Sequence, residues 1–500
     1  MPTATQTATS TWTIDPTVAP AVAGSRWIAL VVLCAGMLMI ILDQTIVNVA
    51  LPSIRRDLGF TQSGLAWVVN AYLIAFGGLL LLAGRVGDLV GRRRVFLIGL
   101  AIFTGASVLC GLSFTQPMLI AARFIQGIGG AVSSAVILAM IVTMFPEPLE
   151  RAKAFGVFSF IASAGAAVGL IAGGLITQAV SWHWIFFVNL PIGLATAVVA
   201  ARLLEADKGI GLGKGADVLG AAMVTASLML GVYAIVQTSD YGLVSVRTLV
   251  LGGIALALLS AFVIRQARGS NPILPLRLLR SRKVAGSNIV QALTSTAFLG
   301  FFFMGSLDLQ RVLGYGPMAI GLAFLPVAVV MALFSIRFSA QLIGRFGPYA
   351  VLLAGQVLAG VALVMVGFGP VSANYTVDLL GPLVLLGFGG GLSFPALAMI
   401  AMADVPPSDA GVASGLLNTT GQVGGAFGLA VLATLAGGRT LDLLRGGVDG
   451  TAALAGGYHF AWLVGACLVV VTLATAAWLL RSGEATEMES TPTAECEAAA

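Results

Sequence analysis

The stretch WIALVVLCAGMLMIILDQTIVNVA, residues 27–50, decides the fold class of this sequence. An α-helix needs about 20 mainly apolar residues to cross the hydrocarbon core of a bilayer, and this stretch supplies them with one ionisable side chain, Asp43. The whole chain is similar, because 58% of its 500 residues are hydrophobic and 9% are charged, against about 25% charged in soluble domains. A single soluble core of this length is excluded, since such cores stop growing near ~250–300 residues. We therefore expect an all-α polytopic membrane protein.

Further stretches of comparable length and apolarity follow along the chain. They lie at residues 64–84, 94–114, 117–143, 154–178, 185–204, 217–237, 247–265, 285–306, 318–338, 349–368, 379–402, 412–436 and 458–480. The segments between them are mostly short, which favours antiparallel neighbours. The sequence therefore predicts about fourteen transmembrane helices.

Lysine and arginine residues indicate the orientation, because cytoplasmic loops carry an excess of them. With a cytoplasmic N-terminus, 19 lie on the inner side and 6 on the outer side, and Arg123 falls within a span. Both termini are therefore predicted to be cytoplasmic. Polar segments at 205–214 and 265–283 separate the seventh and eighth spans from six spans on either side.

This pattern predicts two bundles joined by a helical pair, as in transporters built from repeats. The predicted parts are a disordered cytoplasmic N-terminus (1–25), an N-terminal six-helix bundle (26–205), a linker with two extra spans (206–283), a C-terminal six-helix bundle (284–482) and an acidic cytoplasmic tail (483–500).

Several classes of function are disfavoured by the motifs that the sequence lacks. It has no G-x-x-x-x-G-K-[ST] loop for ATP, and its 4 cysteines and 2 histidines are not spaced as metal ligands. The basic residues are spread between apolar blocks, which indicates membrane orientation rather than nucleic-acid binding. We expect no cofactor, no metal, no catalytic residue, no ATP and no nucleic acid. The expected partners are a small-molecule substrate, protons and the lipid bilayer, and the expected assembly is a monomer.

The loop GRVGDLVGRRR, residues 84–94, concentrates glycine, aspartate and arginine between two spans. Glycine allows helix ends to approach closely, and Asp88 can accept hydrogen bonds from helix N-termini or from arginine. We interpret the loop as a cytoplasmic latch that opens and closes during transport. The alternative, a basic anchor on the inner side, explains the arginines but not the aspartate. The predicted latch residues are Gly84, Asp88, Gly91, Arg92 and Arg93.

This loop resembles a signature of the major facilitator superfamily, and other motifs resemble its fourteen-helix drug:proton antiporters. These motifs are LDQTIVNVALP at 42–52, RFIQGIGG at 123–130 with Gln126 and Gly127, WHWIFFVNLPIG at 182–193, Leu309-Gln310 with Gly314-Tyr315, and GVASGLLN at 411–418. The resemblance covers residues of about 27–480 and occurs in the family's order.

The resemblance implies a secondary active transporter in which two bundles rock about a central cavity. Protons moving inward would drive lipophilic or cationic organic compounds, drugs and antibiotics among them, outward. The implied location is the plasma membrane, which for a bacterium is the inner membrane. The alternatives are an importer or an uncoupled facilitator on the same fold and, from another class, a membrane-embedded enzyme or receptor.

One motif departs from the family's pattern in the fifth span. The stretch GAAVGLIAGG, residues 165–174, keeps Gly165, Gly169, Gly173 and Gly174 but has Leu170 where the antiporters have proline. Without this proline a helix kink is lost. The glycines serve either export or helix packing alone, so the direction of transport stays open.

Asp43 and Arg123 are ionisable residues inside spans, where each costs at least ~2.5–3.5 kcal/mol. At ~1.5 Å per residue, both lie in the outer half of the membrane at similar depth. They are therefore predicted to pair or to share a proton pathway, and the resemblance favours a role in proton coupling. The alternative is a purely structural ion pair.

Polar side chains on several spans are candidates for the substrate cavity. They are Asn48, Trp67, Asn70, Tyr72, Asn288, Gln291, Asp308, Gln310, Asn418 and Gln422. Each can instead join neighbouring helices, and Trp67 can be an interface anchor. For Asp308 we expect a surface acid at a helix end, with a cation-attracting group at the cavity mouth as the alternative.

Overall fold

The structure is a computed structural model. It describes residues 23–60, 62–205, 217–242, 244–269 and 274–480, together with residues 207, 209, 211 and 272. Every regular element in these ranges is a helix, so the predicted all-α class is confirmed. The predicted tails lie outside the described residues, apart from residues 23–25, which begin the first helix and were wrongly assigned to a disordered tail.

The first part of the chain forms helices α1 to α7. They are α1 (Ala23–Leu58), α2 (Gln62–Val90), α3 (Arg92–Gly111), α4 (Gln116–Met144), α5 (Pro148–Ala179), α6 (Trp184–Phe187) and α7 (Asn189–Leu203). Local sequence explains the boundaries: the Thr115 side chain caps α4 by accepting a hydrogen bond from the Met118 amide. Gly91, with a φ of 109°, turns the chain between α2 and α3.

A helical hairpin follows, formed by α8 (Val218–Val236) and α10 (Val246–Arg268), with the short α9 (Thr238–Tyr241) between them and α11 (Leu276–Arg280) after them. Asp217 caps α8 by accepting a hydrogen bond from the Gly220 amide at 2.9 Å. It also pairs with Arg265 near the end of α10 at 2.7 Å. The hydrogen bond from Arg265 holds the pKa of Asp217 below its ordinary value. This carboxylate therefore ties the start of the hairpin to its end.

The rest of the chain forms α12 to α17. These are α12 (Arg282–Arg311), α13 (Pro317–Leu333), the π-helix η2 (Phe334–Phe338), α14 (Ser339–Gly367), the π-helix η3 (Tyr375–Leu379), α15 (Leu380–Ala403), the 3-10 helix η4 (Pro407–Asp409), α16 (Ala410–Arg445) and α17 (Gly450–Leu479). Inside α14, Gly347 has a φ of 78° and precedes Pro348, so the helix direction breaks there.

Among the described residues, 11 helical segments are long and apolar enough to cross a membrane, and Leu219–Ile235 is a shorter apolar helix. One of these segments, Ala319–Gly367, is 49 residues long and contains the break at Gly347. The segment α5 is 32 residues long but is not among the 11. The chain is thus a multi-pass membrane protein, and the count of fourteen spans stays a prediction.

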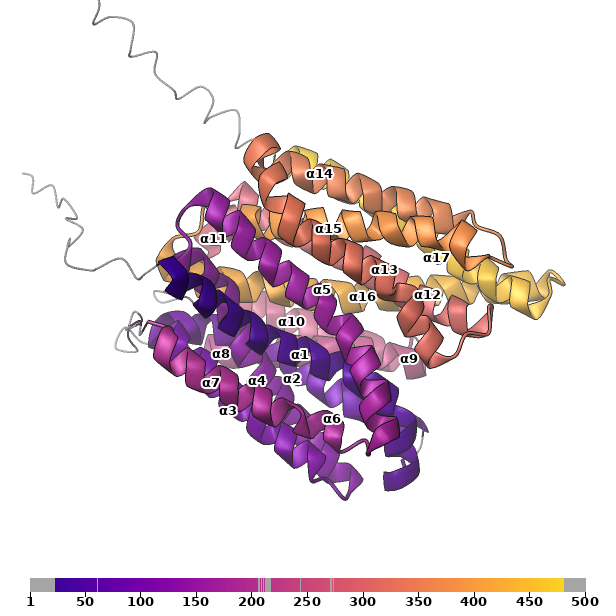
Figure 1. Ribbon diagram of the computed structural model, residues 1–500, viewed down its shortest axis with the longest axis horizontal. Coiled ribbons are helices and arrows are strands. Elements are labelled where there is room, and N and C mark those ends of the chain that lie inside the picture. The colour runs from indigo at the N-terminus through magenta and orange to yellow at the C-terminus, as the bar shows by residue number, and fades with distance from the viewer. Residues whose placement is uncertain are drawn as a thin grey trace, which may run out of the picture.

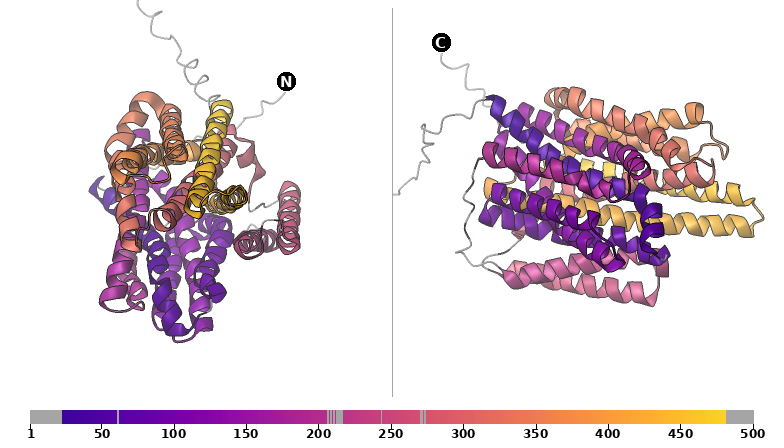
Figure 2. Two further views of the ribbon diagram at one scale, coloured as in Figure 1. Left: turned by 90° about the vertical axis from the view of Figure 1, so that its right-hand side faces the viewer. Right: turned by 60° about the horizontal axis from the view of Figure 1, so that its bottom comes forward.

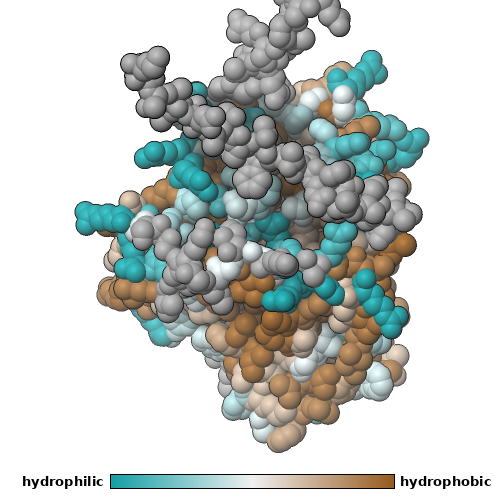
Figure 3. Space-filling model, turned by 90° about the vertical axis from the view of Figure 1, so that its left-hand side faces the viewer, coloured by the Kyte–Doolittle hydropathy of each residue, from teal (hydrophilic) through white to brown (hydrophobic). Residues whose placement is uncertain are grey.

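The helices from the two ends of the chain form two neighbouring groups (Figures 1 and 2). The hairpin of α8 and α10 stands at the periphery, where α8 contacts α2 and α16. The end at which α1 begins and α2 finishes is rich in hydrophilic residues (Figure 3), and we call it the polar end. Helices α2 and α16 meet across the two groups, as do α5 and α13.

The same helix contact occurs once in each group. In α3 and α4, a Cβ added to Gly99 would meet the backbone of Ser133 and the Gly129 carbonyl. In α14 and α15, a Cβ added to Gly355 would meet Ser393 and the Gly389 carbonyl in the same way. Gly91 and Gly347, both with positive φ, precede these helix pairs. The packing of the two groups therefore repeats.

Candidate functional site

Asp43 on α1 and Arg123 on α4 form an ion pair inside the N-terminal helices. The Arg123 Nη1 atom lies 2.5 Å from the Asp43 Oδ2 atom, and the side chains of Arg123 and Asp43 are 1% and 0% exposed. The Nε atom of Arg123 donates to the carbonyl oxygen of Val68 on α2 at 2.9 Å. The structure therefore brings together the two residues that the sequence placed at similar depth, and it adds a third helix to their contact.

Amide and hydroxyl groups complete the surroundings of the Asp43 carboxylate. Its Oδ1 atom accepts hydrogen bonds from Gln126 at 2.8 Å and from Asn189 at 3.2 Å. Gln126 and Asn189 both donate to the Ser107 hydroxyl, at 3.1 and 2.9 Å, and Gln126 accepts from Arg123 at 2.8 Å. These side chains are all buried. We call Asp43, Ser107, Arg123, Gln126 and Asn189 the buried polar network.

Sequence reasoning singled out Asp43, Arg123 and Gln126 but missed Ser107 and Asn189. Asn189 lies in the WHWIFFVNLPIG stretch, which was the available signal, whereas Ser107 belongs to no motif. Gly127 brings α4 close to α2, because a Cβ there would meet the backbone carbonyl of Tyr72. The two motif residues thus have different roles: Gln126 bonds to the carboxylate and Gly127 permits the helix contact.

Aromatic rings cover the guanidinium of Arg123. Its central carbon lies 4.5 Å from the ring centroid of Tyr72 and 5.8 Å from that of Phe186. Cation–π contact adds about 0.5–2 kcal/mol when the cation is desolvated. The arrangement suits the ionised form of Asp43, because three donors point at one carboxylate. Through Arg123, which bonds to Asp43 on α1 and to the Val68 carbonyl on α2, this carboxylate links α1, α2 and α4.

The predicted latch joins the two helix groups at the polar end. Asp88 near the end of α2 accepts hydrogen bonds from the amides of Gly411 and Val412, both at 2.9 Å, at the start of α16. A carboxylate at a helix N-terminus is favoured by the helix dipole as well as by the free amides. Arg92 donates to Asp88 at 2.9 and 3.1 Å and also to the carbonyl of Pro407. Asp88 therefore bonds to both groups at once.

The glycines of the loop let the helices approach. A Cβ at Gly84 would collide with the carbonyl of Gly411, so only glycine fits between α2 and α16 at this point. Gly91 needs its positive φ to turn the chain into α3. Arg93 donates to the carbonyl of Ala201 at the end of α7. All five predicted latch residues thus lie together at contacts that close the polar end.

Asp207 is a latch residue that sequence reasoning missed. Its carboxylate accepts hydrogen bonds from the backbone amides of Arg92 at 2.8 Å and Arg93 at 3.3 Å, at the start of α3. The side chain comes from the segment after α7, more than a hundred positions away, so no local pattern indicated it.

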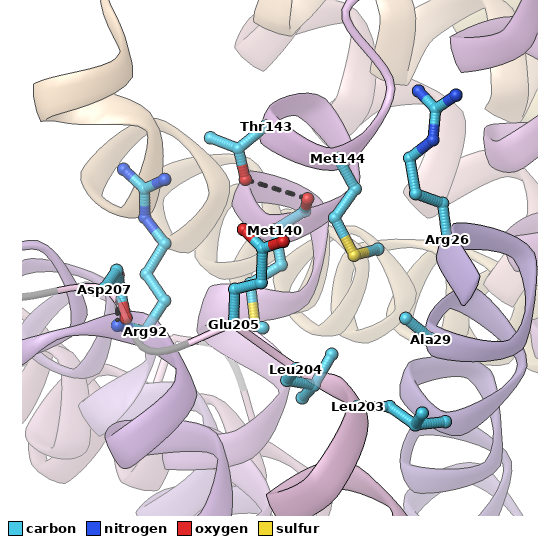
Figure 4. Close-up of a pocket in the computed structure, with 10 residues that line it drawn as sticks. All are labelled: Arg26, Ala29, Arg92, Met140, Thr143, Met144, Leu203, Leu204, Glu205 and Asp207. Carbon is cyan, nitrogen blue, oxygen red and sulfur yellow. Dashed lines mark hydrogen bonds between the residues drawn. The ribbon is translucent and has the colours of Figure 1, made fainter. Parts of the chain in front are cut away.

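A cavity of about 340 Å³ opens beside the latch (Figure 4). It is lined by residues from α1, α3, α4, the end of α7 and the segment after α7: Arg26, Ala29, Arg92, Met140, Thr143, Met144, Leu203, Leu204, Glu205 and Asp207. Side chains of both signs line the cavity: the carboxyl group of Glu205 lies near its centre and the guanidinium of Arg26 at its edge (Figure 4). The cavity belongs to the N-terminal helices, and Arg92 connects it to the latch.

The span-five glycines face α1 along the helix that carries Asp43. A Cβ at Gly165 would meet Leu38 and Ile41, and one at Gly169 would meet Thr45 and the carbonyl of Leu42. Gly173 packs on Ile46, and Gly174 is buried. The side chain of Leu170 lies outside the described part of the structure. These glycines therefore set the distance between α5 and α1 beside the ion pair.

The structure separates the cavity candidates into several kinds. Tyr72 joins the buried polar network through Arg123 and accepts a hydrogen bond from Gln44 at 3.3 Å. The ring of Trp67 packs at a tilt against Tyr233 of α8, with the ring centroids 5.8 Å apart, so it lies where α2 meets the helical hairpin. Asn288 accepts from Thr420 at 2.9 Å and so joins α12 to α16.

The other candidates bond locally or stand at the surface. Gln291 donates to Ser295 at 3.2 Å and Asn418 to the carbonyl of Ser414 at 3.1 Å, each within its own helix. Asn70 is half-buried, Gln310 and Gln422 are exposed, and the side chain of Asn48 lies outside the described residues. Gln291 also lies against Gly421 of α16, next to Gln422.

For Asp308 the preferred interpretation, a surface acid at a helix end, is wrong. Asp308 is 5% exposed, because α12 continues past it to Arg311 and α17 covers it. Within the described residues no group of three or more His, Cys, Asp or Glu side chains is arranged to hold a metal ion.

Comparison with known proteins is consistent with this arrangement. The family model described as Major Facilitator Superfamily matches residues 33–429. A puromycin resistance protein of Streptomyces alboniger is 39% identical over 466 residues, which is 91% of this chain and 91% of that protein. A cephamycin export protein of Amycolatopsis lactamdurans is 39% identical over 415 residues, which is 82% of this chain and 85% of that protein.

Two solved structures share the fold. The human organic anion transporter MFSD10 gives a TM-score of 0.67 at 17% identity and covers 90% of this chain and 99% of its own. A proton:xylose symporter gives a TM-score of 0.63 at 14% identity and covers 90% of this chain and 95% of its own. At these identities the likeness concerns the fold alone.

Proposed function

The chain belongs to the major facilitator superfamily, and we propose that it is a proton-coupled exporter of small lipophilic or cationic organic compounds. The observation that carries the proposal is the buried ion pair of Asp43 and Arg123, at 2.5 Å and shielded from water. Relatives named for puromycin resistance and cephamycin export support outward transport of the substrate.

The coupling step rests on a single carboxylate. An ion pair that loses one partner leaves a buried charge without compensation, which costs about 3–5 kcal/mol. Protonation of Asp43 leaves Arg123 in that situation, so the helices must move to restore its partners or to admit water. Release of the proton re-forms the pair. A substrate that favours one arrangement then exchanges for a proton that favours the other.

The movement we propose is a rocking of two six-helix bundles, 26–205 and 284–482, with α8 and α10 as a linking pair. The latch of Asp88 with Gly411 and Val412 closes the polar end in this structure and must break for that end to open. Each of the fourteen predicted spans falls on helical segments, the sixth on α6 and α7 together and the tenth on α13 and η2, which supports the full count. The 19-to-6 distribution of basic residues supports cytoplasmic termini in a bacterial inner membrane.

The proton gradient is the energy source in this proposal, with no ATP, no cofactor and a monomer as the working unit. The alternatives are an importer and an uncoupled facilitator. Leu170 keeps them open, because the motif that carries it lacks the proline of the antiporters.

The test uses the purified full chain in proteoliposomes that contain a pH-sensitive dye. Ethidium and puromycin serve as substrate probes. Each substrate molecule moved should drive a proton in the opposite direction, and Asp43→Asn should abolish this proton movement while leaving substrate binding measurable. The matched control is Asp442→Asn, which removes an exposed carboxylate that pairs with Arg445 at 3.5 Å.

Each result has a separate meaning. Protons that move with the substrate would establish an importer, and transport without proton movement would establish a facilitator. Coupling that survives in Asp43→Asn at the wild-type ratio would exclude the ion pair as the coupling site.

A further inference from the structure

A second carboxyl group is buried in the C-terminal helices without a charged partner. Asp308 on α12 is 5% exposed, and among the described residues its Oδ1 atom has no hydrogen-bond partner. An isolated carboxylate in an apolar environment is strongly disfavoured relative to the neutral acid. The side chain therefore needs either a proton or a partner that the surrounding helices supply.

The carboxyl group borders a small cavity of about 20 Å³. Around it stand Phe301, Gly305, Phe324, Leu383 and Trp462. A cavity needs about 10–15 Å³ by this measure to hold one water molecule, so there is room for a single water and not for an organic substrate.

Trp462 is a second polar side chain among the described residues that line this cavity. Trp462 on α17 is 3% exposed, and its indole Nε1 atom has no hydrogen-bond partner among the described residues. A buried indole N–H usually finds an acceptor, and a buried water needs 2–4 polar contacts. One water that accepts from Trp462 and donates to Asp308 satisfies both unpartnered atoms.

The other titratable groups on the helices around the cavity are engaged elsewhere. Arg311 on α12 is exposed and lies near the hydroxyl of Tyr458 on α17. On η3, Tyr375 donates to the carbonyl of Ala323 at 2.8 Å, and Asp378 accepts from the amide of Asn374 at 2.7 Å. His459 on α17 stacks its ring on Trp462 with centroids 5.6 Å apart. None of these groups forms an ion pair with Asp308 in the described part of the chain.

The internal repeat shows what the C-terminal carboxyl lacks. Ser133 and Ser393 occupy matching places in the two glycine contacts. The residue ten positions before Ser133 is Arg123, which pairs with Asp43, and the residue ten positions before Ser393 is Leu383. Leu383 lines the cavity of Asp308. The N-terminal acid thus meets an arginine, whereas the C-terminal acid meets a leucine at the matching position.

We propose that Asp308 is a second proton-binding site, at which the neutral carboxyl group is held through one water by the indole of Trp462. This inference rests on the proposed function, because a proton is carried only if transport is proton-coupled. The carboxylate takes one proton to become the acid when the cavity is closed, and it releases that proton when the C-terminal helices admit solvent. Each helix group then carries one exchangeable proton.

The first test is infrared spectroscopy of the purified full chain. A protonated carboxyl group absorbs separately from a carboxylate, and we expect such a band at neutral pH that disappears in Asp308→Asn. Trp462→Phe keeps an aromatic ring but removes the N–H donor, so the band should remain and move to higher frequency as its hydrogen bond weakens. A band that persists in Asp308→Asn, or that Trp462→Phe leaves unmoved, would overturn the site.

The second test measures the number of protons exchanged per ethidium molecule in proteoliposomes. Asp308→Asn should halve this number, whereas Asp43→Asn should abolish exchange at both sites, because the proposed helix movement depends on the pair of Asp43 and Arg123. If Asp43→Asn uncouples transport and Asp308→Asn leaves the ratio unchanged, the second site is wrong and the proposed function stands. If Asp43→Asn remains fully coupled, the proposed function fails, whatever the infrared band shows. If Asp308→Asn does not fold, the shift of the infrared carboxyl band in Trp462→Phe decides whether Asp308 is a proton-binding site.

Discussion

Replacing Asp88 by asparagine tests the latch most directly. The carboxylate accepts four hydrogen bonds, two from the start of α16 and two from Arg92. Hydrogen bonds to charged groups contribute about 1.5–3 kcal/mol each, and neutral ones about 0.5–1.5 kcal/mol. Asparagine keeps one acceptor oxygen but has no charge. It therefore retains one hydrogen bond to α16, with the strength of a bond between neutral groups. We expect the closed polar end to lose about 2–4 kcal/mol, which is roughly a 30- to 1,000-fold change in its population.

The assay is the distance between two spin labels, measured on the full chain in lipid by pulsed electron paramagnetic resonance. Lys153 on α5 and Arg345 on α14 are exposed at the polar end, and a Cβ at Gly344 would lie 3.2 Å from Leu149, so the labelled helices touch there. Spin labels on Lys153→Cys and Arg345→Cys should give one short distance as long as Asp88 is unchanged. Asp88→Asn should add a longer distance as the dominant population.

The matched control is Asp217→Asn. Asp217 also caps a helix and pairs with an arginine, but its partners Gly220, Arg265 and Gln266 all lie in the hairpin of α8 and α10. It should leave the distance distribution unchanged. If Asp88→Asn also leaves it unchanged, or if Asp217→Asn alters it equally, Asp88 does not hold the polar end closed.

Three other predictions follow from the contacts. Gly84→Ala should open the polar end, because the added methyl group does not fit between α2 and α16 and overpacking costs about 1–3 kcal/mol. A cysteine-reactive label should then react faster with Ser414→Cys than it does when Gly84 is present. Gln126→Leu should lower the melting temperature of the protein, because Asp43 loses a buried donor, at about 1–3 kcal/mol. Because the pKa of Asp217 is depressed by Arg265, its stabilisation is present above the ordinary value of 3.8 and lost as pH falls below it. Hydrogen exchange at the start of α8 should accordingly rise at acid pH in the wild type but not in Asp217→Asn.

Helix positions and depths could be predicted from the sequence, because apolar length and rise per residue determine them. That reasoning placed Asp43 and Arg123 together. It could not find Ser107 or Asn189, since hydrogen bonds between spans depend on how each helix is rotated about its axis. It identified Asp88 as an acceptor for a helix N-terminus or for arginine, but not that the helix is α16, because a free backbone amide leaves no mark in the sequence.

The burial of Asp308 could not be predicted from the sequence either. A carboxylate near the end of an apolar stretch is ordinarily at the membrane surface, and the predicted span ended at 306, two residues before it. In the structure α12 extends to Arg311, and α17 packs against α12 and covers the acid. A boundary error of a few residues therefore changed a surface group into a buried one. The position of Trp462 opposite it is a tertiary contact across more than 150 residues of chain.

Helix α2 provides a physical link between the ion pair and the latch. The carbonyl of Val68 accepts from Arg123, and the ring of Tyr72 lies against the same guanidinium. Asp88 lies twenty residues further along the same uninterrupted helix, about 30 Å away at 1.5 Å per residue. A helix of this length moves as a rigid element. When Arg123 loses its partner on α1, its remaining bonds are to α4 and α2, so a displacement of α2 at one end must move the carboxylate that holds α16 at the other. One proton at Asp43 can therefore bias a latch at the opposite end of the molecule without a chain of intermediate side chains.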